Sequence, residues 1–136
     1  MADFSIRLFD ALDYAGYPRL VNASDLSGAK RVAIESFPTS AWRSLGLKPL
    51  AGKSKDWRAH VEDRLKALRE LIPISLDEPP SHDELQALIA GLAGLSLLGS
   101  RTINYSFTGE KPVRLEGTWR EGFIANPTRS AIGLVS

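Results

Sequence analysis

The chain has 136 residues and a formal net charge of +1, so its length fits a single domain (residues 1–136) with a core of ordinary density. Apolar residues make up 43% of the sequence and charged residues 24%, which excludes an intrinsically disordered chain. The sequence contains no cysteine, which excludes disulfides, thiolate metal sites and thiol catalysis.

Charge and hydropathy also limit the partners and the location of the protein. The small net charge creates no global field for a nucleic acid or a membrane surface, so such a site needs a local cluster. The most apolar stretch, residues 85–98, is shorter than the roughly 20 residues of a membrane span. The first residues include Asp3 and Arg7 and lack a signal-peptide core. We therefore expect a cytoplasmic protein with no membrane partner.

The first predicted elements are a helix and a strand. Residues 3–15 carry apolar side chains at helical spacing, Gly16 suits the position after a helix, and Pro18 prevents continuation. Residues 30–37 form a β-branched run whose apolar side chains alternate onto both faces. Because both faces are mostly apolar, we expect a central strand covered on both sides.

Three helices are expected after this strand. The first is short and capped by Thr39 or Ser40. The second covers residues 55–71, and Pro73 prevents its continuation. The third spans residues 82–98. The helix over 55–71 carries an apolar stripe made of Trp57, Val61, Leu65, Leu68 and Ile72.

The C-terminal part has the period of β-strands. Residues 103–107 alternate apolar and polar side chains, a turn follows, and residues 113–119 provide a return strand. A final short strand is expected at residues 122–125. The fold class is therefore α/β, with a sheet flanked by helices and a C-terminal β-hairpin.

Glu35, near the end of the predicted central strand, is the first candidate for chemistry. Strands are depleted in glutamate, and an acid in such a position needs solvent, a counter-ion or a metal. Ligands gather at the carboxyl ends of strands in open α/β sheets. Two roles stay open: a metal ligand or general base, and a glutamate paired with a neighbouring Arg or Lys.

Asp83 lies at the start of the third helix and is the second candidate. It can join Glu35 in a carboxylate pair that holds Mg²⁺ or Mn²⁺, or it can simply be an acid favoured by the helix dipole. Ser81 and Glu84 have the spacing of a capping box. His82 can ligate a metal or shuttle a proton, but a solvated histidine is the simpler interpretation.

A basic cluster lies around the loop that follows the predicted strand. Its members are Lys48, Lys53, Lys55 and Arg58, with Trp42 and Trp57 beside them. Cations interleaved with aromatic side chains can bind single-stranded nucleic acid. Both tryptophans can equally belong to the core, and that alternative stays open.

Four blocks of the chain resemble motifs of a large bacterial and archaeal family of predicted nucleases with a ribonuclease H-like fold. They are VAIESFPTSAWRSLGL (residues 32–47), AGKSK (51–55), HDELQALIA (82–90) and REGFIANP (120–127). They are similar, in order and spacing, to that family's IEVYPAA-WRALGL, YKGK, D-x-x-D-A-L and EEGWIVVP motifs. The resemblance covers roughly residues 30–127.

The resemblance implies a hydrolase in which clustered acids hold Mg or Mn for phosphodiester hydrolysis. By position, Glu35 and Asp83 would be metal ligands and catalytic residues, while Lys53 and Lys55 would contact the phosphates of a nucleic acid. The family's second helix acid is replaced by Gln86, a weaker ligand that cannot act as a base. The alternative function is a non-catalytic, partner-binding or regulatory remnant of the fold.

Family members usually begin with a β-hairpin sheet whose first strand supplies an aspartate, and this chain starts with the helix before the Glu35 strand. A sheet without its first strands exposes an edge, which natural proteins avoid. We therefore predict a homo-oligomer or a second chain that completes the sheet. Size-exclusion chromatography with light scattering checks this, and a stable monomer would count against it.

Overall fold

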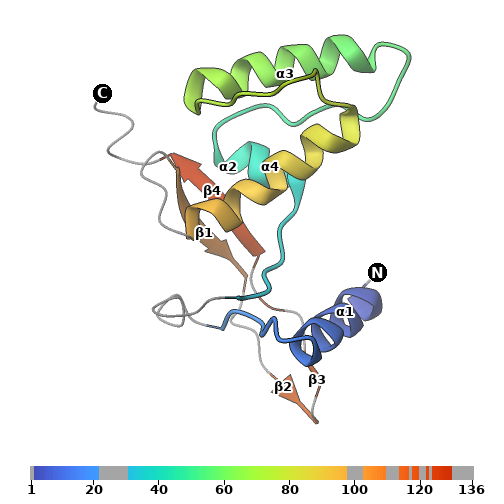
Figure 1. The fold of residues 1–136 in the computed structure, drawn as a ribbon, viewed down its shortest axis with the longest axis vertical. Helices are drawn as coiled ribbons and strands as arrows, with labels where there is room; N and C mark the ends of the chain where they lie inside the picture. The colour runs from blue at the N-terminus through green and yellow to red at the C-terminus, as the bar shows by residue number, and fades with distance from the viewer. Residues whose placement is uncertain are drawn as a thin grey trace. The chain divides into compact units, whose positions relative to one another are not determined.

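The computed structural model describes residues 2–21, 31–97, 103–109, 114–116, 118–119, 122 and 124–129. The helices are α1 (Ala2–Tyr14), α2 (Pro38–Ser44), α3 (Trp57–Leu71) and α4 (His82–Leu97). The strands are β1 (Ile103–Thr108), β2 (Arg114–Leu115), β3 (Thr118–Trp119) and β4 (Ile124–Arg129) (Figure 1). The protein is thus a mixed α/β protein, as its sequence predicts.

The chain divides into two compact units. The first consists of Met1–Glu35 and Phe107–Ala125, and the second of Ser36–Ser106 and Asn126–Ser136. Within the part of the chain that the structure describes, no helix is long and apolar enough to cross a membrane.

The first unit begins with α1, which contacts β3. Phe9 on this helix is buried, whereas the neighbouring Leu8 is exposed. The helix ends at Tyr14, and Gly16 follows it as predicted, with a φ of 94° that is readily adopted only by glycine. The N–H of Tyr17 then donates to the carbonyl of Leu12 at 2.8 Å, which closes the last turn.

The prediction of a central strand over residues 30–37 is wrong in the described part of that range. Ala33 alone forms a parallel bridge, with Arg19. Its N–H donates to the carbonyl of Pro18 at 2.8 Å. Pro18 has no N–H, so the ladder cannot continue on its side of the bridge. The apolar alternation therefore belongs to an irregular extended segment.

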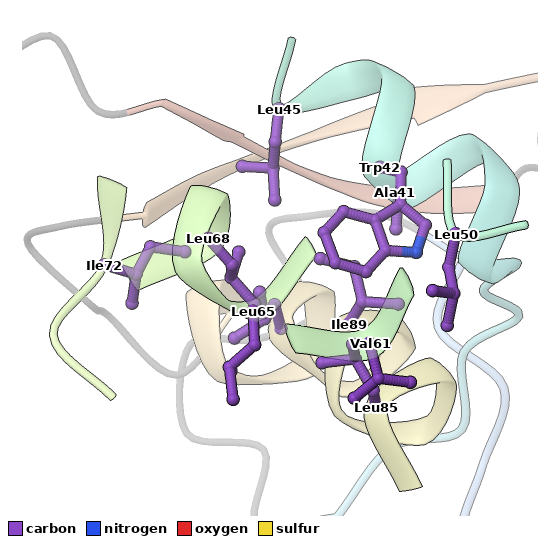
Figure 2. Packing of buried hydrophobic residues seen from close by; sticks show 11 residues of the cluster. Ala41, Trp42, Leu45, Leu50, Val61, Leu65, Leu68, Ile72, Leu85 and Ile89 are labelled. Atoms are coloured by element: carbon purple, nitrogen blue, oxygen red, sulfur yellow. The ribbon is translucent and has the colours of Figure 1, made fainter. Parts of the chain in front are cut away.

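The second unit is built around a helical core. Helices α2 and α3 both pack against α4. The core cluster contains Ala41, Trp42, Leu45, Leu50, Val61, Leu65, Leu68, Ile72, Leu85, Ile89 and Leu92 (Figure 2). Of the apolar stripe predicted for the helix over 55–71, all members but Trp57 are buried, and Trp57 packs at the margin. Helical periodicity therefore located this core correctly.

Helix α2 begins differently from the prediction. Phe37 occupies the N-cap position without a side-chain hydrogen bond, and a proline starts the helix. Neither Thr39 nor Ser40 acts as the cap. The Ser40 hydroxyl instead donates to the side-chain oxygen of Asn126 at 2.7 Å, which ties α2 to β4.

The strand pairing also corrects the prediction. Strand β1, predicted to pair with residues 113–119, pairs with β4 instead. Strands β2 and β3 pair with each other in antiparallel fashion, Arg114 opposite Trp119 and Leu115 opposite Thr118, and Glu116 after β2 has a φ of 52°. The strand predicted at residues 122–125 starts at Ile124 and includes Pro127. A two-stranded sheet has only edge strands, where proline is tolerated.

We predict that Leu85→Ala, a change in the middle of the helical core, lowers the free energy of unfolding by about 2–5 kcal/mol. Leu85 is fully buried, so the truncation removes contacts and leaves a cavity. Leu95→Ala on the same helix is the matched control, because Leu95 is 51% exposed. Urea denaturation followed by circular dichroism measures both; equal losses would contradict the assigned core.

Candidate functional site

Glu35 is paired with a buried arginine of the first unit. Its Oε2 lies 3.6 Å from Nη2 of Arg19, and the guanidinium stacks 3.7 Å from the ring centroid of Phe9. Burial lowers the pKa of Arg19, and the negative charge of Glu35 opposes that shift. The main-chain carbonyl of Glu35 also accepts a hydrogen bond from Ala125 at 2.8 Å. Of the two roles left open by the sequence, the ion pair is the one observed.

Asp83 lies in the first turn of α4, on the surface of the second unit. Its Oδ2 is 2.8 Å from the ammonium nitrogen of Lys53. The hydrogen bond from Lys53 holds the pKa of Asp83 below its usual range, and His82 adds a smaller effect in the same direction. Both side chains are largely exposed, so breaking this ion pair leaves two solvated charges and no buried, unpaired one.

The loop before α3 brings Lys53 to Asp83, whereas Lys55 is exposed in the turn that precedes the helix. Lys53 and Asp83 are separated by 30 positions in the sequence. The sequence predicted a role for each of them, but it did not predict that they meet.

His82 is buried rather than solvated, which corrects the simpler sequence interpretation. Only 8% of its surface is exposed. Its Nε2 lies 2.6 Å from the carbonyl oxygen of Ala51 and must donate to it, because a carbonyl oxygen only accepts. Its Nδ1 has no hydrogen-bond partner among the described residues and lies 3.7 Å from Oδ1 of Asp83.

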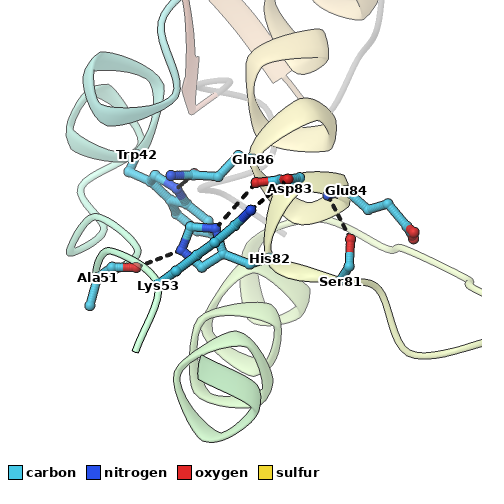
Figure 3. A network of polar contacts seen from close by, with 8 residues as sticks. All are labelled: Trp42, Ala51, Lys53, Ser81, His82, Asp83, Glu84 and Gln86. Atoms are coloured by element: carbon cyan, nitrogen blue, oxygen red, sulfur yellow. Dashed lines mark hydrogen bonds and ion pairs between the residues drawn. The ribbon is translucent and has the colours of Figure 1, made fainter. Parts of the chain in front are cut away.

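Together these residues form a pocket at the start of α4. Its volume is about 220 Å³, and it is lined by Lys53, Trp57, Ser81, His82 and Asp83. The Ser81 hydroxyl oxygen accepts the N–H of Glu84 at 3.1 Å, which confirms the Ser81 half of the predicted capping box. Figure 3 shows the side chains of Lys53, His82 and Asp83 meeting at the first turn, with Ser81 directed toward Glu84.

Gln86 has a structural role that the sequence analysis missed. Its Oε1 accepts a hydrogen bond of 3.0 Å from Nε1 of Trp42, which is fully buried (Figure 3). A buried tryptophan N–H requires an acceptor, and this requirement was the available signal. Because Trp42 belongs to the core, it is inaccessible to a nucleic-acid base. Trp57 remains partly exposed, with the Arg58 guanidinium 4.8 Å from its ring centroid.

The expected metal ligands, Glu35 and Asp83, belong to different units, and each has a cationic partner. Among the described residues, no three His, Asp or Glu side chains gather as a metal site would require. A Mg²⁺ or Mn²⁺ ion would have to displace Arg19 from one carboxylate and compete with Lys53 at the other. Metal binding at these two acids stays a prediction.

Comparison of the chain with protein-family models finds no match, and comparisons with curated proteins and with solved structures find none either.

We predict that Lys53→Met raises the pKa of Asp83 toward its ordinary value, because the substitution removes the hydrogen bond and the charge that favour the carboxylate. A pH titration of the carboxyl signals by NMR measures the change. Asp63 is an internal control, since Arg64 lowers its pKa independently. An unchanged Asp83 titration, with Asp63 also unchanged, would refute the ion pair.

Proposed function

We propose that this chain is a non-catalytic, ligand-binding relative of the ribonuclease H-like predicted nucleases. The observation that supports the proposal is the pairing of both expected metal ligands with basic side chains, Glu35 with Arg19 and Asp83 with Lys53. Each carboxylate already has the counter-charge that a divalent ion would otherwise supply.

The environment of Glu35 favours a structural role. The side chain of Arg19 is only 2% exposed, so its charge depends on Glu35 for compensation. Removing one partner of a buried ion pair typically costs about 3–5 kcal/mol. A divalent cation on this carboxylate would also repel the guanidinium 3.6 Å away. Glu35 is therefore better explained as the counter-ion of Arg19 than as a catalytic metal ligand.

The environment of Asp83 favours exchangeable binding. The Asp83 and Lys53 side chains are 75% and 62% exposed, and exposed ion pairs contribute little to stability. Their polar atoms can thus change partners at small cost when a ligand enters the adjoining pocket. This feature favours a binding role for the start of α4.

A divalent-metal nuclease is the second candidate. The hydrogen bond between Lys53 and Asp83 favours it, because it brings the lysine expected to contact phosphate beside the acid expected to bind metal. In that case, Lys53 would orient an anionic substrate, and the ion would supply charge stabilisation for phosphodiester hydrolysis.

Calorimetric titration with Mn²⁺ separates the two candidates. We expect the wild-type chain, Glu35→Gln and Asp83→Asn to give the same heats as Asp63→Asn, a control in which another exposed, ion-paired aspartate is neutralised. Binding by the wild type that is lost in both Glu35→Gln and Asp83→Asn would overturn the non-catalytic proposal. Circular dichroism verifies folding, and the double variant Arg19→Met, Glu35→Gln avoids leaving a buried, unpaired arginine.

A further inference from the structure

A second cavity of the second unit, the α3 groove, lies along α3. Its volume is about 390 Å³, within the roughly 300–1,000 Å³ of small-molecule sites. One wall is a face of α3, and the other is the segment over residues 76–79, which runs back along the helix toward α4 (Figure 1). The α3 wall consists of Glu62, Leu65, Lys66 and Arg69. The groove shares no lining residue with the pocket at the start of α4.

The floor of the α3 groove is apolar and held in place by the helical core. Leu65 is buried in the core cluster, and Leu76 packs against it from the opposite wall. Ile74 also packs against the cluster, and Pro80 is buried. The segment between them is therefore attached to the core on both sides of its exposed bend, and this attachment keeps the two walls apart.

Opposite charges line the two walls. Lys66 and Arg69 extend from α3, whereas Asp77 and Glu78 come from the bend in the other wall. All four side chains are exposed. None of the ion pairs formed among the described residues includes any of them. The cavity therefore lies between two bases and two acids that do not neutralise one another directly.

We propose that the α3 groove binds a small zwitterion with an apolar side chain, namely a free amino acid or a dipeptide. Its carboxylate would bind the two cations of α3, and its ammonium group would bind the two acids of the other wall. Its side chain would lie on the apolar floor. Arg69 suits the carboxylate because a guanidinium can bind both carboxylate oxygens at once.

The mixture of charges favours a zwitterion over simpler ligands. An inorganic anion attracted by Lys66 and Arg69 would also face the acids of the groove, which are Glu62, Asp77 and Glu78. A simple amine attracted by these acids would face both bases. Within the described ranges, the three acids do not gather closely enough to hold a metal ion. Only a ligand with both charges finds a partner for each.

NMR titration of the full chain with leucine tests the proposal. N-acetylleucine, which lacks the positive charge, and leucinamide, which lacks the carboxylate, are the matched ligands. We expect leucine to bind about tenfold more tightly than either, because each of them loses one set of charge-assisted hydrogen bonds. Equal affinity for leucine and for one of these derivatives would overturn the proposal.

Arg69→Gln tests the carboxylate end of the site. Arg69 is exposed, so its replacement spares the core, and circular dichroism verifies folding. We expect leucine affinity to fall about tenfold and leucinamide affinity to stay the same, since leucinamide has no carboxylate. Arg58→Gln is the control, because Arg58 is an exposed arginine of α3 that does not line the groove. Equal effects of the two substitutions would refute the assignment.

The double variant Asp77→Asn, Glu78→Gln tests the ammonium end. We expect it to lose affinity for leucine about tenfold and to retain its affinity for N-acetylleucine. The double variant Asp56→Asn, Glu70→Gln changes the net charge equally at exposed positions outside the groove, so it should bind leucine normally. Normal leucine binding by the first double variant would contradict the proposal.

A titration with leucyl-leucine distinguishes the two sources of the zwitterion. Tighter binding of leucine supports a free amino acid, and tighter binding of leucyl-leucine supports a peptide. Failure of both compounds to bind would refute the zwitterion site. That result would not affect the function proposed for the start of α4, which the Mn²⁺ titration tests separately.

Discussion

The burial of Trp42 is the constraint on which the second unit depends. Its ring is fully buried in the cluster formed by α2, α3 and α4, and its N–H is bonded to Gln86 of α4. The polar bond fixes the orientation of a large side chain that apolar contacts alone would leave less defined. By fixing α2 against α4, it also fixes the helix start at which His82 and Asp83 lie.

The helices of this protein could be predicted because their signals are local. The stripe along α3 repeats every three or four residues, and Gly16 and Gly46 end helices with the positive φ angles that only glycine adopts easily. The cap at Ser81 is equally local, since it bonds to a residue three positions away. Such features need no knowledge of the rest of the chain.

The strands and the site could not be predicted in the same way, because their partners are distant in sequence. Pro18 lacks the N–H that would extend the pairing at Ala33. The alternation of apolar residues around Ala33 does not indicate this distant constraint. His82 is buried through the carbonyl of Ala51, 31 positions away, and Gln86 meets Trp42 across 44 positions. Residue types identified Glu35 and Asp83 as candidates, but only tertiary structure showed their cationic partners.

The division into two units has a consequence for the order in which the protein is assembled. Every residue of the helical core cluster lies between Ala41 and Leu92, whereas the first unit combines Met1–Glu35 with Phe107–Ala125. The ribosome therefore synthesises these core residues before Phe107–Ala125, the second segment of the first unit. Contacts within a contiguous segment close short loops, and those between distant segments form later and more slowly. The residues of the helical core are therefore all synthesised before β4, which supplies Ala125 to the first unit and Asn126 to the second.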